Sequence, residues 1–320
     1  LSPSAAGAGM APALQIGRDL AKFVAPAAGF ELEAVPSAGS AENVRRLRFE
    51  PDVKFALVQS DVYQAYLNQA DVGKAEAATL IRPLRVILPL YNEEIYFIAR
   101  ADSPLNWVHE IRGSKINVGP LHSGTAMSAT TIYRQMFREP VADATTTFLS
   151  NEEALAKLVT DKSIDVVVIV AGQPAKVLTD MKPEARALIK LLKFDPNHAA
   201  SKEALKTYFP ATIRAASYPN LLAEDSPGLA VKAFLVTYDY NLAGTVTNLS
   251  RFGRALCENF DALKTQGHPK WKEVDLALPE LGKGWQYFAP VAREIRRCAA
   301  PVQVRQSACT TEQKILGLCE

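Results

Sequence analysis

Short apolar runs alternate with amphipathic helical segments along most of this chain. The run DVVVIVAG (165–172) shows no polar alternation, which is typical of a strand buried on both faces of a parallel sheet. The preceding segment NEEALAKLVTD carries apolar residues at helical spacing. Repeated strand-then-helix units form α/β domains, because each helix must bury its apolar face against a sheet. The sequence therefore predicts an α/β fold with mainly parallel sheets.

Two sets of strand–helix units follow one another along the 320 residues, and a late strand at 228–239 follows the second set. This order predicts two lobes that are joined by more than one crossing of the chain. We expect lobe 1 to contain residues 1–97 and 228–297, and lobe 2 to contain residues 98–227. A tail that contains cysteine would then occupy residues 298–320.

Local patterns predict several finer features. Two separate strands are expected at 82–90 and 94–100, because each is a short apolar run. The adjacent acids Glu93 and Glu94 would then lie in a solvated turn between these strands. The segment 210–229 is rich in Pro, Ser and Tyr and is predicted to be a loop.

Charge and hydropathy limit the function classes. The formal net charge is only +2, with Lys and Arg dispersed, so a nucleic-acid partner is not expected. No run of about 18 apolar residues occurs, so no membrane-spanning segment is predicted. The sequence begins at Leu1 rather than at a methionine, and we expect that a targeting segment was removed from this end.

The cysteines bear on the compartment. No CxxC pair occurs among the four cysteines and only four histidines are present, so no metal site is expected. An even number of cysteines near a loop-rich end predicts two disulfides and an oxidising compartment, with the pairing left open. Buried free thiols in a cytosolic protein are the alternative. The disulfide candidates are Cys257, Cys298, Cys309 and Cys319.

Three strand-to-helix junctions carry polar residues at their tips: VQSDVY (58–63), GPLHSGTA (119–126) and VAGQPA (170–175). Unpaired backbone N–H groups and the positive end of the helix dipole favour a carboxylate or phosphate at such positions. In open α/β sheets the ligand lies at the carboxyl ends of the strands. The three junctions therefore predict an anion-binding crevice between the two lobes.

An enzyme is the alternative to a binding protein. Ser123 beside His122 suggests a nucleophile and base, but the string Leu121-His122-Ser123-Gly124-Thr125 lacks the first glycine of GxSxG. No carboxylate is placed to orient a histidine, so we interpret Ser123 or Thr125 as a helix N-cap and expect no enzyme activity. The short motif at Gly7–Gly9 lacks the third glycine of a dinucleotide fingerprint, and no cofactor is expected.

Seven sequence blocks resemble the TAXI family of solute-binding proteins in order and spacing, over roughly residues 5–265. They are VPSAGSAENVRRL, FALVQSDVYQAY, IYFIARADSPL, INVGPLHSGTA, DVVVIVAGQPA, FPATIRAASYP and GLAVKAFLVT. The resemblance implies an extracytoplasmic protein of the class II periplasmic-binding-protein fold. Its two lobes would close over a small organic anion, such as an amino acid or a dicarboxylate, and deliver it to the membrane subunits of a TRAP transporter.

The resemblance also implies which residues contact the ligand. The corresponding positions are Gln59, Ser60, Asp61 and Tyr63 in the first lobe, Ser123, Gly124, Thr125, Ala171 and Gly172 in the second, with Tyr91 and Ser217 as further candidates.

The chain also departs from the family pattern. The usual GSGTE is HSGTA here, with Ala126 in place of the acid, which favours a more apolar carboxylate than glutamate. The family's first strand is expected to precede Leu1 and to be mostly absent. A ligand-sensing domain of the same fold, signalling to a membrane partner, is the alternative to transport.

Overall fold

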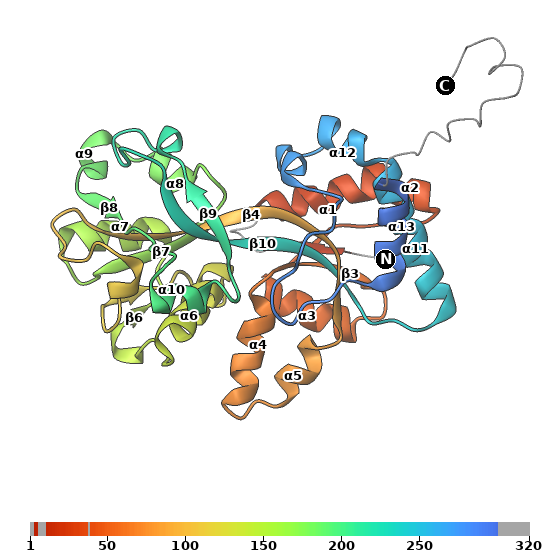
Figure 1. Cartoon of the computed structure of the whole chain (residues 1–320), viewed down its shortest axis with the longest axis horizontal. Helices are drawn as coiled ribbons and strands as arrows, with labels where there is room; N and C mark the ends of the chain where they lie inside the picture. The colour runs from red at the N-terminus through yellow and green to blue at the C-terminus, as the bar shows by residue number, and fades with distance from the viewer. Residues whose placement is uncertain (1–2, 6–10, 38, 300–320) are drawn as a thin grey trace, which may run out of the picture.

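The computed structural model describes residues 3–5, 11–37 and 39–299. Within these residues one mixed sheet of ten strands runs through the molecule in the order β2-β1-β3-β10-β4-β7-β5-β6, with β8 paired to β4 and β9 to β10 (Figure 1). The strands are β1 (Pro3–Ala5), β2 (Val35–Pro36), β3 (Phe55–Gln59), β4 (Leu84–Arg100), β5 (Ile116–Asn117), β6 (Thr146–Thr147), β7 (Val166–Ala171), β8 (Ile189–Leu191), β9 (Phe209–Ile213) and β10 (Ser226–Tyr238).

Helices cover the sheet on both faces. The α-helices are α1 (Ala11–Phe23), α2 (Ala25–Ala28), α3 (Ser40–Phe49), α4 (Val62–Asp71), α5 (Glu76–Ile81), α6 (Gly124–Phe137), α7 (Asn151–Thr160), α8 (Lys176–Thr179), α9 (Pro183–Arg186), α10 (Ala199–Ala204), α11 (Ala243–Glu258), α12 (Phe260–Gln266) and α13 (Ala289–Ala299). Short 3-10 helices are η1 (Val108–Glu110), η2 (Asp143–Thr145), η3 (Ala215–Ser217) and η4 (Pro269–Glu273). Among the described residues, none of these helices combines the length and apolarity needed to cross a membrane.

The two longest strands, β4 and β10, join two lobes (Figure 1). The second half of β10 pairs with β3, and its first half pairs with β9. The second half of β4 pairs with β7 and β8. We call β1–β3 with α1–α5 and α11–α13 lobe 1, and β5–β9 with α6–α10 lobe 2. The predicted two-lobed α/β architecture is confirmed. The boundaries predicted at residues 97/98 and 227/228 stay a prediction, because β4 and β10 contribute to both lobes.

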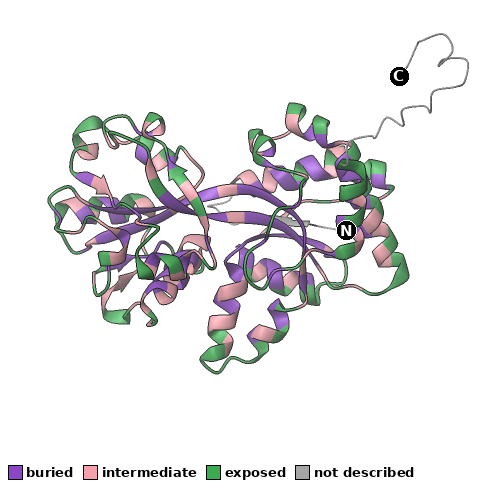
Figure 2. Cartoon of the chain, viewed as in Figure 1, coloured by how far each residue is buried: buried purple, intermediate pink, exposed green. Residues whose placement is uncertain are grey.

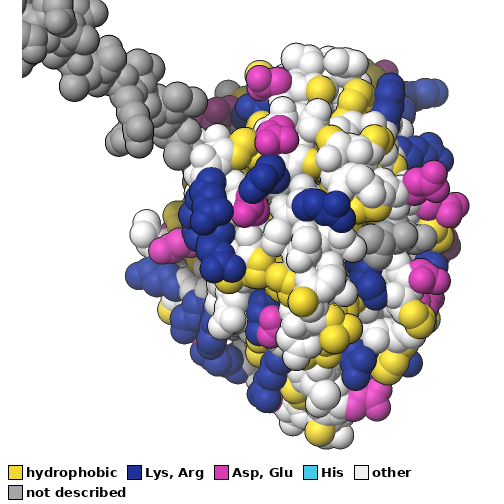
Figure 3. Space-filling model, turned by 90° about the vertical axis from the view of Figure 1, so that its right-hand side faces the viewer, with side chains coloured by type: hydrophobic (Ala, Val, Ile, Leu, Met, Phe, Trp, Pro, Cys, Tyr) yellow, Lys and Arg dark blue, Asp and Glu magenta, His cyan; other side chains and the backbone are white. Residues whose placement is uncertain are grey.

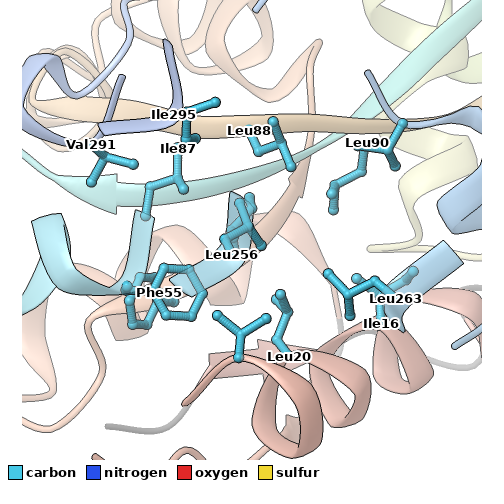
Figure 4. Close-up of a cluster of buried hydrophobic side chains, with 14 of the residues drawn as sticks. Ile16, Leu20, Phe55, Ile87, Leu88, Leu90, Leu256, Leu263, Val291 and Ile295 are labelled. Atoms are coloured by element: carbon cyan, nitrogen blue, oxygen red, sulfur yellow. The ribbon is translucent and has the colours of Figure 1, made fainter. Parts of the chain in front are cut away.

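Each lobe buries two apolar clusters, one on each face of its part of the sheet. The central strands are accordingly buried along most of their length (Figure 2). In lobe 1, Leu20 of α1 and Leu256 of α11 belong to the same cluster as Phe55 of β3 (Figure 4). The opposite cluster contains Val58 of β3 and Trp285. Because neighbouring residues of a strand point to opposite faces, a continuous apolar strand serves both clusters. This explains the unbroken apolar runs in the sequence.

The structure corrects several local predictions. The two strands predicted at 82–90 and 94–100 are one continuous strand, β4. Glu93 and Glu94 are only 4% and 8% exposed within it, so the predicted solvated turn is wrong. Polar residues in the middle of an apolar run resemble a turn in sequence, but here they mark the point where the strand passes from one lobe to the other.

One further prediction differs from the structure. The segment 210–229 is not a continuous loop, because β9 and the start of β10 pair as an antiparallel ladder within it. At the start of the chain, the short strand β1 lies between β2 and β3 and pairs in parallel with both.

One disulfide joins Cys257 of α11 to Cys298 near the end of α13. The prediction of disulfide bonding is thus confirmed for this pair. The bond links α11 to Cys298, the first residue of the predicted tail. Cys309 and Cys319 lie outside the described residues, as do most of the tail and the motif at Gly7–Gly9. The end of the molecule that carries α11 and α13 displays both basic and acidic side chains (Figure 3).

Candidate ligand-binding cleft

The three predicted junctions meet at one cavity of about 580 Å³ between the two lobes. The last residue of β3, the β5–α6 connection and the last residues of β7 all contribute to its wall, at the carboxyl ends of these strands. Lobe 1 and the central strand β4 supply Gly39, Gln59 and Glu93, and lobe 2 supplies Pro120, Leu121, His122, Ser123, Gly124, Thr125, Ser150, Asn151, Glu152, Ile169, Val170, Ala171, Lys176 and Val177.

Helix α6 begins at the cavity. The hydroxyl of Ser123 accepts a hydrogen bond from the backbone N–H of Ala126, with 3.0 Å between Oγ and N. This confirms Ser123 as the N-cap. The first-turn N–H groups of a helix have no partner within the helix, and Gly124 and Thr125 lie on the cavity wall. The N-terminus of α6 thus presents a partial positive charge to the cleft.

A second helix, α7, also begins at the cavity, and the sequence reasoning missed it. Ser150 caps this helix by accepting a hydrogen bond from the backbone N–H of Glu153, and Asn151 and Glu152 line the cavity. The signal was present in the sequence, since Ser150 and Glu153 have the spacing of a capping box. Two helix N-termini of lobe 2 therefore favour an anion at the same cavity.

The loop that leads into α6 is tightly turned. Gly119 has a φ of +89°, and a Cβ at this position would lie 2.9 Å from the Cγ2 atom of Thr125. His122 has a φ of 64°, which is uncommon for a residue other than glycine. This conformation brings Ser123 to the cap position, where its hydroxyl accepts the bond from Ala126. Such a hydroxyl is already oriented by the helix rather than by a base.

Gln59 faces this helix from lobe 1. It is 2% exposed, and its backbone N–H donates to the Oγ atom of Ser40 at 2.9 Å. A Cβ added at Gly124 would overlap the amide group of Gln59, so the two lobes are in close contact here. Among the described residues, the Oε1 atom of Gln59 has no hydrogen-bond partner. A buried acceptor is therefore left open beside the cavity.

Glu93 lies next to Gln59. The Nε2 atom of Gln59 donates to the Oε2 atom of Glu93 at 3.5 Å, which is a long hydrogen bond. Burial raises the pKa of Glu93 to about 7, and the Gln59 amide and the charge of Lys270 offset only part of this effect. Lys270 itself pairs with Glu273 at 2.6 Å. In the described part of the chain, no basic side chain forms an ion pair with Glu93.

Other candidate residues of lobe 1 lie outside the cavity wall. The hydroxyl of Ser60 accepts a hydrogen bond from the backbone N–H of Lys232, and its carbonyl accepts one from the Trp285 indole. Tyr63 packs against Trp285, with 5.2 Å between ring centroids. The structure places both residues where they support the β3–α4 connection.

Of the remaining candidates, some line the cavity and others do not. Ala171 lines the cavity, and the neighbouring Gly172 approaches Lys270, since a Cβ at Gly172 would lie 3.3 Å from its Nζ atom. Tyr91 is 1% exposed and packs in the core of lobe 1. Ser217 lies in η3 and is not part of the cavity wall. The structure thus brings together Gln59, Ser123, Gly124, Thr125 and Ala171, and their role in ligand contact stays a prediction.

Asp61 makes a different contact between the lobes. It is fully buried, and its Oδ2 atom accepts a hydrogen bond of 3.0 Å from the Tyr208 hydroxyl. The same hydroxyl lies 3.0 Å from the carbonyl oxygen of Ser128 in α6. Burial raises the pKa of Asp61 to about 6, and the bond from Tyr208 opposes this only in part. A hydroxyl has one proton to donate, so a protonated Asp61 would allow both contacts to be hydrogen bonds.

Residues 5–282 match the family model described as the NMT1-like family. Among solved structures, the chain is similar to SsuA, a periplasmic sulfonate-binding protein from Methylobacillus flagellatus KT, with 10% identity, coverage of 93% and 84% of the two chains, and a TM-score of 0.48. It is also similar to ArtJ, an arginine-, lysine- and histidine-binding protein from Geobacillus stearothermophilus, with 12% identity, coverage of 88% and 97%, and a TM-score of 0.46.

A TctC solute binding protein from Polaromonas is similar over 93% of this chain and 95% of that chain, with 15% identity and a TM-score of 0.44.

Proposed function

The chain belongs to the NMT1-like family, and from this premise we propose that it is a solute-binding receptor that captures a small organic anion between its two lobes. The observation that carries this proposal is the cavity wall. The N-termini of α6 and α7 meet there, opposite the buried amide of Gln59 whose Oε1 atom has no partner among the described residues. Helix N-termini favour anions, and the buried open acceptor indicates that this wall is built for a ligand.

The proposed mechanism is closure of the lobes over the ligand. A ligand whose anionic group lies at Gly124 and Thr125 in lobe 2, and which also donates a hydrogen bond to the Oε1 atom of Gln59 in lobe 1, would stabilise the closed arrangement more than an open one. Hydrogen bonds from N–H groups to a carboxylate contribute about 1.5–3 kcal/mol each. The receptor would perform no chemistry on the ligand.

Binding of small anions tests the proposal directly. Protein that has been unfolded, dialysed and refolded is titrated calorimetrically with short-chain carboxylates, amino acids and dicarboxylates, and each acid is paired with its neutral amide as a control. We expect at least one acid to bind and its amide to bind at least tenfold more weakly. If no acid binds, or if the amides bind equally well, the receptor proposal is wrong.

An enzyme that uses Ser123 as a nucleophile is the competing function. The cap hydrogen bond from Ala126 favours a structural role for this hydroxyl. We expect the protein not to hydrolyse activated esters such as p-nitrophenyl acetate above the rate of Ser123→Ala. Turnover that is lost in this variant would support the enzyme instead.

Delivery to the membrane subunits of a TRAP transporter, and an extracytoplasmic location, are the finer parts of the proposal. The resemblance to the TAXI family supports the first, and the Cys257–Cys298 disulfide supports an oxidising compartment. Uptake of the bound anion into vesicles that contain such a transporter should require this protein. Thiol titration of the denatured, unreduced protein should find close to none of the four cysteines reactive, and four reactive thiols would contradict an oxidising location.

A further inference from the structure

We infer that the cleft selects an anion that also carries a hydrogen-bond donor, either an ammonium or a hydroxyl group, and that Glu93 is the residue that receives this donor. The inference rests on the proposed function and narrows the ligand class of the same site. Among small carboxylates, it favours amino and hydroxy acids and disfavours dicarboxylates.

The first observation is an excess of buried acceptors on one wall. Glu93 is 4% exposed and lines the cavity, and the hydrogen bond that it receives from Gln59 is 3.5 Å long. Beside it, the Oε1 atom of Gln59 has no partner among the described residues. Buried acceptors are normally paired with donors. A donor group of the ligand at this position would supply the missing partner to both side chains.

The second observation is that the nearby cation is already engaged. Lys270 donates to Glu273 at 2.6 Å and to the carbonyl of Asn92 at 3.4 Å. Its charge acts on Glu93 only through space. The carboxylate of Glu93 therefore lacks a direct counter-ion in the described part of the chain, although buried carboxylates are usually paired.

The part of the wall that lobe 2 supplies has the reverse character. Gly124 and Thr125 of α6 and Asn151 of α7 present the N–H ends of two helices to the same cavity. The charged side chains of Glu152 and Lys176 also border it, and both are exposed to solvent. A ligand that spans the cleft thus meets donors at one end and acceptors at the other. A dicarboxylate that used both walls would place its second negative charge against Glu93, where the low local polarity strengthens repulsion.

A matched ligand series tests this inference. Butyrate, its 2-, 3- and 4-amino derivatives, the corresponding hydroxy derivatives and succinate are titrated at pH 8.5, above the pKa of about 7 of Glu93. We expect at least one amino or hydroxy derivative to bind at least tenfold more tightly than butyrate, and succinate to bind no more tightly than butyrate. The two sets of derivatives distinguish an ammonium from a hydroxyl donor.

Two variants assign the effect to a residue. Glu93→Gln should reduce the preference for the donor-bearing acid over butyrate to less than about threefold. Glu94→Gln is the control. It removes the same charge from the next residue of β4, which does not line the cavity, and should retain the preference.

The outcomes separate the two proposals. Tightest binding by succinate to the wild-type protein, or an unchanged preference in Glu93→Gln, would overturn the inference and leave the receptor proposal standing. Failure of every acid in a broad anion screen would instead overturn the receptor proposal. The wild-type ranking alone decides the ligand class if Glu93→Gln does not fold.

Discussion

Two buried acids near the contact between the lobes, Glu93 and Asp61, differ in what surrounds them. Burial raises the pKa of each, to about 7 for Glu93 and to about 6 for Asp61. Glu93 borders the cavity and receives one long hydrogen bond, from Gln59. Asp61 has no exposed surface and receives a hydrogen bond of 3.0 Å from Tyr208 of lobe 2. Burial and a raised pKa therefore do not by themselves identify a binding residue, and the adjoining cavity is what distinguishes Glu93.

The comparison also assigns different consequences to the two acids. Loss of the Asp61 carboxylate is expected to alter stability and to leave the cavity wall unchanged. Loss of the Glu93 carboxylate is expected to alter the choice of ligand.

The largest effect is expected in the pH dependence of stability. The pKa of Asp61 is raised from 3.8 to about 6, so the folded protein holds its proton more tightly than the unfolded chain. The contribution is fully present below pH 3.8 and is lost as the pH rises through about 6, which removes about 3 kcal/mol from the free energy of unfolding. Asp61→Asn has no carboxyl group that titrates at this position, so its free energy of unfolding should not fall in this way. Urea unfolding of both proteins between pH 3 and 7.5 should show their difference change by this amount.

Parallel stability curves for wild type and Asp61→Asn would show that Asp61 does not titrate as an isolated buried acid. Glu93→Gln provides the comparison, because its window lies higher, between pH 4.5 and about 7. A ligand that neutralises Glu93 should reduce the pH dependence that is assigned to Glu93 and should leave that of Asp61 unchanged.

Removal of the Tyr208 hydroxyl is the next largest change. Tyr208→Phe removes the hydroxyl that lies between Asp61 and the carbonyl of Ser128, so both buried groups lose their hydrogen-bond partner, which should lower the free energy of unfolding by about 1–3 kcal/mol. Tyr240→Phe is the control, because the Tyr240 hydroxyl makes only a 3.5 Å contact with the carbonyl of Val53. Equal losses in the two variants, measured by urea unfolding, would contradict the special role of the contact through Tyr208.

A methyl group at the lobe contact should act on binding more than on folding. Gly124→Ala places a Cβ against the Gln59 amide, so this amide must move from its position beside the cavity or the lobes must separate slightly. We expect at least a tenfold loss of affinity for the anion identified by calorimetry, which corresponds to about 1.4 kcal/mol. Gly244→Ala adds the same methyl group near the start of α11, where nothing lies within 4 Å, and should bind normally. A normal affinity in Gly124→Ala would place the ligand away from this contact.

The smallest effect is expected at the helix cap. Ser123→Ala removes the acceptor for the N–H of Ala126 and should destabilise the protein by about 1 kcal/mol, as for other N-caps. Ser150→Ala makes the same change at α7 and should cost a similar amount. Thermal unfolding measures both. A much larger loss in only one of them would mean that its hydroxyl has a second structural partner.

The sequence by itself determined the features that depend on neighbouring residues. Continuous apolar runs such as 165–172 indicated strands buried on both faces, and the hydroxyl of Ser123 before a helical pattern indicated the cap at α6. The order of strand–helix units indicated two lobes and directed attention to the junctions at Gln59, Ser123 and Ala171. These signals are local, because periodicity and capping involve residues within a few positions of one another.

The tertiary structure alone decided the roles of the acids. Glu93 and Glu94 resemble a solvated turn in sequence, and only the pairing of β4 with β10 and β7 shows that they are buried in a continuous strand. Gln59 meets Glu93 across 34 positions of the sequence, and Asp61 meets Tyr208 across 147. No local pattern encodes such contacts, because they depend on how strands from both lobes are ordered in one sheet. Whether a buried carboxylate faces a cavity or a hydroxyl is therefore decided when the two lobes come together.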